Sequence, residues 1–134
     1  MSEYFKKYLK NIKFEKNLRD LKKKLKDKKI IIYGTGLLFQ YINENFDLSE
    51  LNILGVSDIK FSVEQDGEKY LGYNVIPKSL IPKYNPDYVI VASENYMTLM
   101  EELHLEFIEY DSIKFLPLAK KSMMEIIKII WQIV

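Results

Sequence analysis

The residues best suited to bind a ligand form a short glycine turn, Gly34-Thr35-Gly36, directly after the apolar run of residues 29–33. Three consecutive isoleucines in that run predict a strand buried on both faces, and residues 37–46 predict a helix after the turn. Glycines let the backbone turn tightly and approach a ligand closely, while the first N–H groups of a helix attract an anion. This succession of strand, turn and helix therefore predicts a phosphate-sized cradle for a nucleotide.

Two further polar residues end strands that the sequence predicts. Asp58 closes the run of residues 51–58, about 20 positions beyond Gly36, where a doubly wound sheet carries an acidic residue that accepts hydrogen bonds from ribose hydroxyls or a base edge. A turn aspartate without a ligand fits the same pattern. Ser93 ends the buried run of residues 87–93, and we expect it to face the same crevice as the glycine turn.

The other reactive residues do not amount to a catalytic set. Tyr110 and Lys114 have the Tyr-x-x-x-Lys spacing of short-chain dehydrogenases, in which the lysine lowers the pKa of the tyrosine, but 10 tyrosines and 20 Lys and Arg produce such a match by chance. His104 ends a predicted helix, a position that suits a partner of the helix dipole better than a base. Glu101 and Glu102 are adjacent on a solvent-facing helical stretch and point apart. The sequence therefore favours a binding protein over an enzyme.

Length and composition set the class of protein. A chain of 134 residues with 48% apolar and 29% charged residues predicts one globular domain with a soluble surface. It has no cysteine and a single histidine, which argue against disulfides, thiolate metal sites and multi-histidine clusters. Neither a secretory leader nor an apolar run of about 18 residues is evident, so we expect a cytoplasmic protein without a metal.

The charge is unevenly distributed along the chain. Residues 1–29 contain 12 Lys and Arg against 4 Asp and Glu, so a basic arm precedes an acidic remainder. The apolar positions of the arm predict two amphipathic helices, about residues 3–12 and 15–27, with a break near Lys13. Such an arm packs on its own sheet or on a second copy, or it binds anionic lipid at a membrane surface. Nucleic acid is disfavoured, because no recognition motif accompanies the charge.

The remaining segments complete an α/β fold. We expect a hairpin over residues 61–71 around Asp66-Gly67, a third strand at residues 72–77, a helix at residues 95–104 and an edge strand at residues 107–108 and 113–116. The strand order expected for a parallel sheet is 3-2-1-4-5. Residues 119–134 predict an apolar helix that either packs on the sheet or forms a dimer seam. The expected division is an arm at 1–28, a nucleotide-binding domain at 29–117 and a packing or dimerisation helix at 118–134.

Four signatures in order carry a resemblance to a known family: Gly34-Thr35-Gly36, Gly55-Val56-Ser57-Asp58, Gly72-Tyr73-Asn74-Val75-Ile76, and the run of residues 87–93. Together they resemble the Rossmann-like domain attached to bacterial surface-polysaccharide enzymes, such as nucleotide-sugar acyltransferases and membrane-bound sugar-nucleotide dehydratases. The resemblance covers about residues 29–104. Two positions depart from the family pattern, since Phe39 replaces a small residue and Ile59 stands where a second acidic residue is common.

This resemblance implies nucleotide or nucleotide-sugar binding at Gly34, Thr35, Gly36 and Asp58, with Ser93 facing the crevice, on a glycan pathway. The catalytic module that accompanies the domain in that family is missing here, so the expected function is a non-catalytic binding module that acts with a separate glycan-pathway enzyme. One alternative is a ligand-free scaffold that joins a partner, or a second copy through its terminal helices. A second alternative is a small NAD(P)-dependent oxidoreductase that uses Tyr110.

Overall fold

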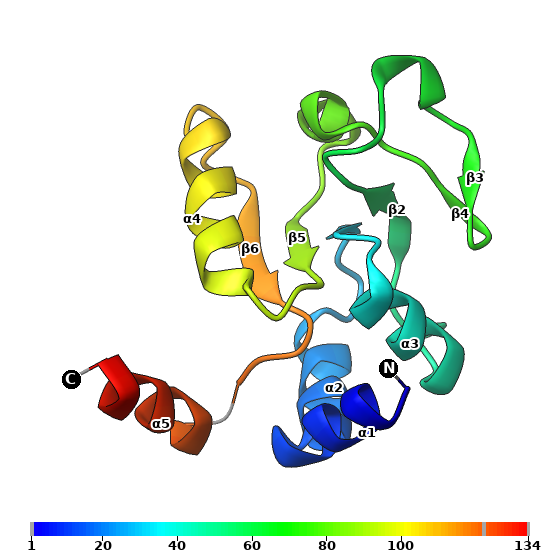
Figure 1. Cartoon of the computed structure of the whole chain (residues 1–134). Helices are drawn as coiled ribbons and strands as arrows, with labels where there is room; N and C mark the ends of the chain where they lie inside the picture. Colours follow the sequence, from blue (N-terminus) through cyan, green and yellow to red (C-terminus); the bar gives the residue numbers. More distant parts are fainter. Residues whose placement is uncertain (1, 122, 134) are drawn as a thin grey trace.

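A four-stranded parallel sheet organises the chain, as the computed structural model of residues 2–121 and 123–133 shows (Figure 1). Its strands stand in the order β2-β1-β5-β6, and each neighbouring pair is parallel. The strands are β1 (Ile30–Tyr33), β2 (Ile53–Ser57), β5 (Tyr88–Val91) and β6 (Lys114–Pro117). The expected mixed α/β class with a parallel sheet is therefore confirmed.

The central strand β1 is buried on both faces, as its three isoleucines predicted. Because successive side chains of a strand point to opposite faces, they feed two separate cores. Ile30 and Ile32 belong to a core that includes helix α3 (Leu37–Asn45) and the N-terminal arm. Ile31 and Tyr33 belong to a second core that includes Leu103 of helix α4 (Tyr96–Glu106). The sheet thus has a helical layer on each face, with α4 standing apart from the arm (Figure 1).

The arm forms two helices, α1 (Ser2–Asn11) and α2 (Phe14–Lys24), with the break at Lys13 where the sequence predicted it. Lys13 has a left-handed backbone, with φ 56° and ψ 50°, which reverses the chain between the helices. The apolar side of the arm is built into the first core rather than standing free. Its buried members are Phe5, Leu9, Ile12, Phe14, Leu18 and Leu25.

The segment between β2 and β5 differs from the expectation in two ways. Instead of a full third strand at residues 72–77, Val75 makes a single parallel bridge to Val56, beside the edge strand β2. The hairpin of β3 (Lys69–Tyr70) and β4 (Tyr73–Asn74) turns at Leu71 and Gly72, not at Asp66-Gly67. Both turn residues have positive φ, at 53° and 84°, which is the backbone that a tight two-residue hairpin requires.

The segment between β2 and β5 also contains two short 3-10 helices. The first, η1 (Val63–Gln65), is closed by a capping box in which Ser62 and Gln65 satisfy each other's backbone groups. The second, η2 (Lys78–Tyr84), is the short connection that leads to β5. Its Ile81 is fully buried in the second core, so this connection also covers the sheet.

The last helix, α5 (Met123–Ile133), lies apart from the sheet in Figure 1. Four of its described apolar side chains are exposed, namely Ile127, Ile130, Trp131 and Ile133. The expected packing against the sheet is therefore not observed for these four. Across residues 2–121 and 123–133, no helix has both the length and the apolar character needed to cross a bilayer.

Candidate functional site

The glycine turn leads directly from β1 into α3, and its first glycine has a structural role. Gly34 has a φ of 109°, and its N–H donates to the carbonyl of Ser57 at 2.8 Å. A Cβ placed on Gly34 would lie 2.8 Å from the carbonyl oxygen of Ala92. Since L side chains rarely adopt this backbone and no Cβ fits here, Gly34 lets the ends of three strands approach each other.

The second glycine has open space in front of it. Gly36 is exposed, has an ordinary φ of −76°, and a Cβ there would meet nothing within 4 Å. It is the N-cap of α3, so the unpaired N–H groups of the first helical turn open beside it. Gly36 therefore leaves room for a ligand at a helix N-terminus, whereas Gly34 does not.

Phe39, which departs from the family pattern, is fully buried in the first core. Its ring lies 6.0 Å from the ring of Tyr73 on β4. The small residue of the dinucleotide fingerprint allows a helix to pack closely on a strand. Here the large ring is accommodated by the hairpin segment, and the turn keeps its shape.

Asp58 holds the glycine turn in place. One of its carboxylate oxygens accepts both the N–H and the hydroxyl of Thr35, each at 2.8 Å, and the other accepts the N–H of Lys60 at 3.2 Å. Burial works to raise the pKa of Asp58, but the hydrogen bonds from Thr35 and Lys60 outweigh it and leave that pKa below its ordinary value. Asp58 is thus a half-buried carboxylate that braces Thr35, whose side chain is fully buried.

A crevice of about 280 Å³ opens at the carboxyl ends of β1, β2 and β5. It brings together four of the five residues that the sequence predicted, Gly34, Gly36, Asp58 and Ser93. Thr35 does not line it, because its side chain turns inward to Asp58. Ser93 accepts the N–H of Asn95 at 3.1 Å through its hydroxyl. From β1 the chain first forms β2 on one side and later returns to form β5 on the other side of β1. Ligands of open parallel sheets usually bind at this reversal of strand order, and the crevice lies there.

Tyr33, the last residue of β1, brings a phenol to this crevice. Its side chain is 6% exposed, and within the described part of the chain its hydroxyl has no hydrogen-bond partner. Burial, followed by the charges of Asp58, Glu106 and Glu102, raises the pKa of Tyr33 to about 12. Tyr33 therefore stays protonated at neutral pH and offers a hydrogen-bond donor to a ligand.

The charge of the crevice is predominantly negative. Asp58, Glu102 and Glu106 line it together with one cation, Lys78. The Nζ of Lys78 lies 3.0 Å from a carboxylate oxygen of Glu106, so this cation is already paired. Three carboxylates against one paired lysine favour hydrogen-bond donors such as hydroxyl groups over a second anion in the body of the crevice.

A buried serine lies beside Tyr33 in the sheet. Ser57 is paired with Tyr33 in the register of β1 and β2, and paired residues of neighbouring strands point to the same face. The Oγ of Ser57 is buried and has no hydrogen-bond partner among the described residues. Unpaired buried polar groups of this kind are uncommon and occur where water or a ligand completes the site.

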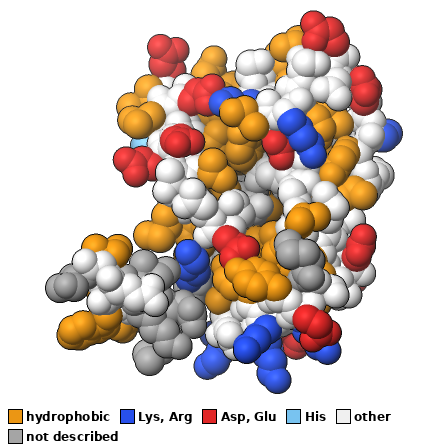
Figure 2. All heavy atoms as spheres, viewed as in Figure 1, with side chains coloured by type: hydrophobic (Ala, Val, Ile, Leu, Met, Phe, Trp, Pro, Cys, Tyr) orange, Lys and Arg blue, Asp and Glu red, His pale blue; other side chains and the backbone are white. Residues whose placement is uncertain are grey.

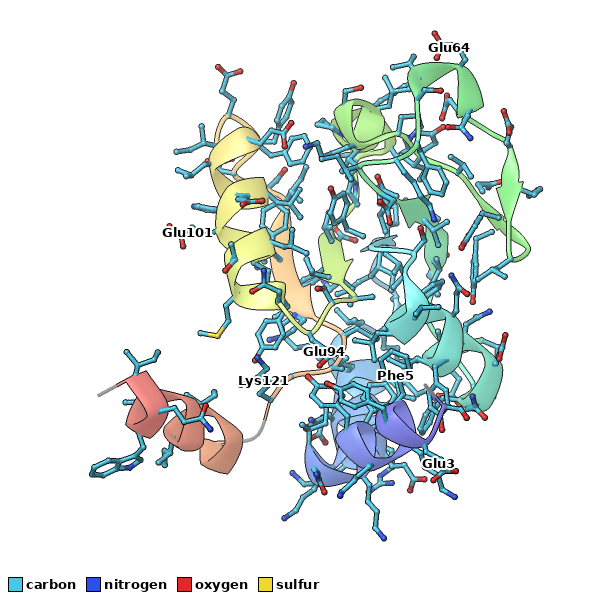
Figure 3. All side chains as sticks on the ribbon, viewed as in Figure 1. Glu3, Phe5, Glu64, Glu94, Glu101 and Lys121 are labelled. Atoms are coloured by element: carbon cyan, nitrogen blue, oxygen red, sulfur yellow. The ribbon has the colours of Figure 1, made fainter. Side chains whose placement is uncertain are left out.

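The other sequence candidates lie outside the crevice lining. Tyr110 is 47% exposed in a turn, while the Nζ of Lys114 lies 5.9 Å from the ring centre of Tyr88, so the two residues do not form a pair. His104 is exposed on α4 with its ring 6.2 Å from that of Phe115. Glu101 points away from the sheet (Figure 3). Among the described residues, no group of three or more His, Cys, Asp or Glu is arranged to hold a metal ion.

Besides apolar lining residues, sequence reasoning missed three polar residues of the crevice: Tyr33, Lys78 and Glu106. Glu102 was predicted to face solvent, and it is exposed as predicted, but it also lines the crevice. A usable signal existed for Tyr33, because a polar residue that ends a buried strand just before a glycine turn lies at the ligand edge of a parallel sheet. No comparable signal existed for Lys78 and Glu106, since their position depends on how η2 and α4 pack.

Comparison with known proteins places most of the chain in one family model. The family model described as C2185-like, N-terminal matches residues 26–116, which include the sheet up to Leu116 of β6, the glycine turn and every residue that lines the crevice. No curated protein matches the chain, and no solved structure matches it.

Proposed function

The chain belongs to the C2185-like, N-terminal family, and we propose that it is a non-catalytic module that binds a nucleotide or nucleotide-sugar. The observation that carries this proposal is the crevice at the carboxyl ends of β1, β2 and β5, bordered by the open Gly36 and by Asp58. Ligands of open α/β sheets bind at this edge. The finer features of the proposal are a Rossmann-like sheet of order 3-2-1-4-5, with Val75 in the place of the third strand, and a role in surface-polysaccharide synthesis beside a separate enzyme.

The crevice chemistry supports a particular orientation of the ligand. Its carboxylates accept hydrogen bonds and Tyr33 donates one, a combination that suits the vicinal hydroxyls of a ribose or another sugar. The phosphate would lie outside this acidic part, at Gly36 and the N-terminus of α3. A volume of about 280 Å³ is just below the usual range of ligand sites, which is roughly 300–1,000 Å³. It fits one sugar or nucleoside unit better than a complete dinucleotide.

A thermal-shift panel of UDP-sugars, CMP-sugars, nicotinamide dinucleotides and coenzyme A tests this proposal. A ligand at 100 times its dissociation constant adds about 2.7 kcal/mol to the free energy of unfolding. The expected result is a clear shift with a nucleotide-sugar and a smaller one with the dinucleotides. If none of these compounds shifts the unfolding temperature, the proposal is wrong.

The two glycines provide a matched pair of variants for the same assay. Gly36→Val should keep the fold and lose the shift, because its side chain projects into open space where the ligand would lie. Gly34→Val should instead lower stability by about 3 kcal/mol or more, since it combines an overpacked contact with a left-handed backbone. A Gly36→Val protein that retains the full ligand shift would show that the ligand binds elsewhere.

A ligand-free scaffold is the second candidate function. It is favoured by Asp58, whose two oxygens already accept three hydrogen bonds from the protein, and by the exposed apolar side chains of α5. This candidate predicts a dimer or larger species in light scattering. A strictly monomeric protein that binds a nucleotide would reject it.

A small NAD(P)-dependent oxidoreductase is the third candidate. It requires turnover of a nicotinamide cofactor that the Tyr110→Phe substitution abolishes. The size of the crevice and the position of Tyr110 outside its lining weigh against this candidate.

A further inference from the structure

A second hollow lies on the arm, between α1, α2 and the C-terminal end of α3. Its volume is about 540 Å³, which exceeds that of the crevice. Its floor is apolar and aromatic: Leu9 and Phe14 are buried, and Tyr41 and Phe46 are partly exposed. The rings of Phe14 and Phe46 meet edge to face with centres 4.8 Å apart, which makes this floor a fixed surface. We call this hollow the arm groove.

The rim of the arm groove is strongly basic. It consists of Lys6, Lys10, Lys13, Lys16, Arg19 and one carboxylate, Glu15. Only Lys16 among these cations is within ion-pair distance of a described carboxylate, at 3.6 Å from Asp20, and both of these side chains are largely exposed. Figure 2 shows Lys and Arg side chains gathered at the lower end of the molecule, where α1 and α2 lie. The rim therefore presents several unpaired positive charges around an apolar floor.

The left-handed backbone of Lys13, with φ 56°, reverses the chain between α1 and α2, and Lys13 lies on the rim of the groove. The rim cations therefore come from both helices and from the residue that joins them.

We infer that the arm groove binds an anionic phospholipid at a membrane surface, with the lipid headgroup against the rim cations and part of an acyl chain on the aromatic floor. The charge of the rim selects an anion, and the apolar floor selects an amphiphile over a free inorganic ion. Clusters of Lys and Arg bind anionic membrane surfaces through their charge. The inference does not depend on the crevice or on its ligand.

The helix α5, outside the groove lining, carries a second surface that suits lipid better than nucleic acid. Ile130, Trp131 and Ile133 are 54%, 75% and 80% exposed, and they form an apolar surface that a polar nucleic acid backbone would not cover. Tryptophan is enriched at the boundary between lipid and water. Trp131 is the one tryptophan of the chain, so its fluorescence reports the environment of α5 alone.

Co-sedimentation of the full chain with vesicles tests the inference. We expect binding to vesicles of phosphatidylcholine with phosphatidylglycerol, weak binding to phosphatidylcholine alone, and a blue shift of Trp131 emission on binding. Each lysine near an anionic surface contributes roughly a fivefold gain in partitioning. The variant Lys6→Gln, Lys10→Gln, Lys13→Gln should therefore bind about 100-fold more weakly.

A matched control separates the groove from the overall charge of the arm. The variant Lys23→Gln, Lys26→Gln, Lys28→Gln removes the same number of charges from exposed positions outside the groove lining, and we expect it to lose threefold or less. Equal losses in the two variants would overturn the groove as the site. So would full competition by 10 mM inorganic phosphate, or binding to a single-stranded oligonucleotide without binding to the vesicles.

Discussion

The crevice and the arm groove differ in charge, in lining and in how far the protein satisfies its own polar groups. In the crevice, Asp58 and Lys78 are already bonded to the protein, and three carboxylates dominate the charge. In the arm groove the cations stand around an apolar floor, and most of them have no carboxylate within reach among the described residues. The crevice is thus suited to a hydroxyl-bearing ligand and the groove to an anionic amphiphile.

The two sites also border different cores, and this difference explains how they coexist in a small domain. Tyr33 and Leu103 of the crevice belong to the core on the α4 face of the sheet, while Leu9 and Phe14 of the groove belong to the core on the α3 face. The buried strand β1 contributes to both cores. The strand β5 does so as well, with Ile90 in the first core and Val89 and Val91 in the second, so both strands connect the two sites.

Removing the arm gives the largest expected effect and tests whether the two sites are separable. Deletion of residues 1–27 takes six buried apolar side chains out of the first core. Each is worth about 1.5–3 kcal/mol before the entropy of ordering the arm is deducted. We therefore expect a much lower unfolding temperature or an aggregating protein in calorimetry and light scattering.

The opposite outcome of that deletion would be informative. A truncated protein that is as stable and as monodisperse as the full chain, and that lacks lipid binding, would show that the arm is a separate docking element. The crevice and the arm would then be independent units.

An intermediate effect is expected from Asp58→Asn, because Asp58 accepts two hydrogen bonds from Thr35. We expect the free energy of unfolding to fall by about 1–2 kcal/mol at pH 7. This is at the low end for hydrogen bonds to a charged acceptor, because Asp58 is only half-buried. The pKa of Asp58 is lowered in the folded protein. Its stabilisation is therefore complete above the unfolded value of about 3.9 and is lost as the pH falls through the folded value.

Urea unfolding as a function of pH measures this contribution. Below about pH 4 the difference between the native protein and Asp58→Asn should shrink. Asp111→Asn, in an exposed turn, serves as the control and should have little effect. A difference that stays constant down to pH 2 would mean that Asp58 does not brace the turn through its charge.

The smallest expected effect, and the most specific to the crevice, comes from Tyr33→Phe. The hydroxyl of Tyr33 has no partner within the described residues, so stability should change by less than about 0.5 kcal/mol. A ligand that accepts its hydrogen bond should bind about three to ten times more weakly in calorimetric titration. The control is Tyr84→Phe. The hydroxyl of Tyr84 donates to Asp66 at 2.7 Å and lies outside the crevice lining, so its loss should leave the affinity for the ligand unchanged. Equal affinities of the native protein and Tyr33→Phe would remove Tyr33 from the site.

Much of the sheet could be predicted from local patterns. The isoleucine run of β1 and the valine-rich run of β5 are buried on both faces, so their composition alone identifies them. The break at Lys13 was visible because the apolar stripe of the arm changes face there. The third strand could not be predicted as a single bridge, because nothing local shows that residues 73–74 pair with β3 instead.

The sequence predicted which residues lie at the crevice better than it predicted what each of them does there. Strand ends identified Gly36, Asp58 and Ser93 as residues of one crevice, because carboxyl ends of parallel strands meet at one edge. They did not reveal that Asp58 bonds Thr35 or that Gly34 abuts Ala92, since both depend on distances between separate loops. The acidic character of the crevice likewise depends on the packing of α4, which brings Glu102 and Glu106 to its rim.

The first core unites segments from both halves of the chain, and this has a consequence for protein synthesis. Phe5 and Ala119 belong to the same buried cluster, and the side-chain amide of Asn17 donates to the carbonyl of Lys120 at 3.3 Å. The apolar side of α1 and α2 therefore cannot be fully covered on the ribosome until residues beyond 119 have left the exit tunnel. Folding of this core therefore completes only after translation of the sheet.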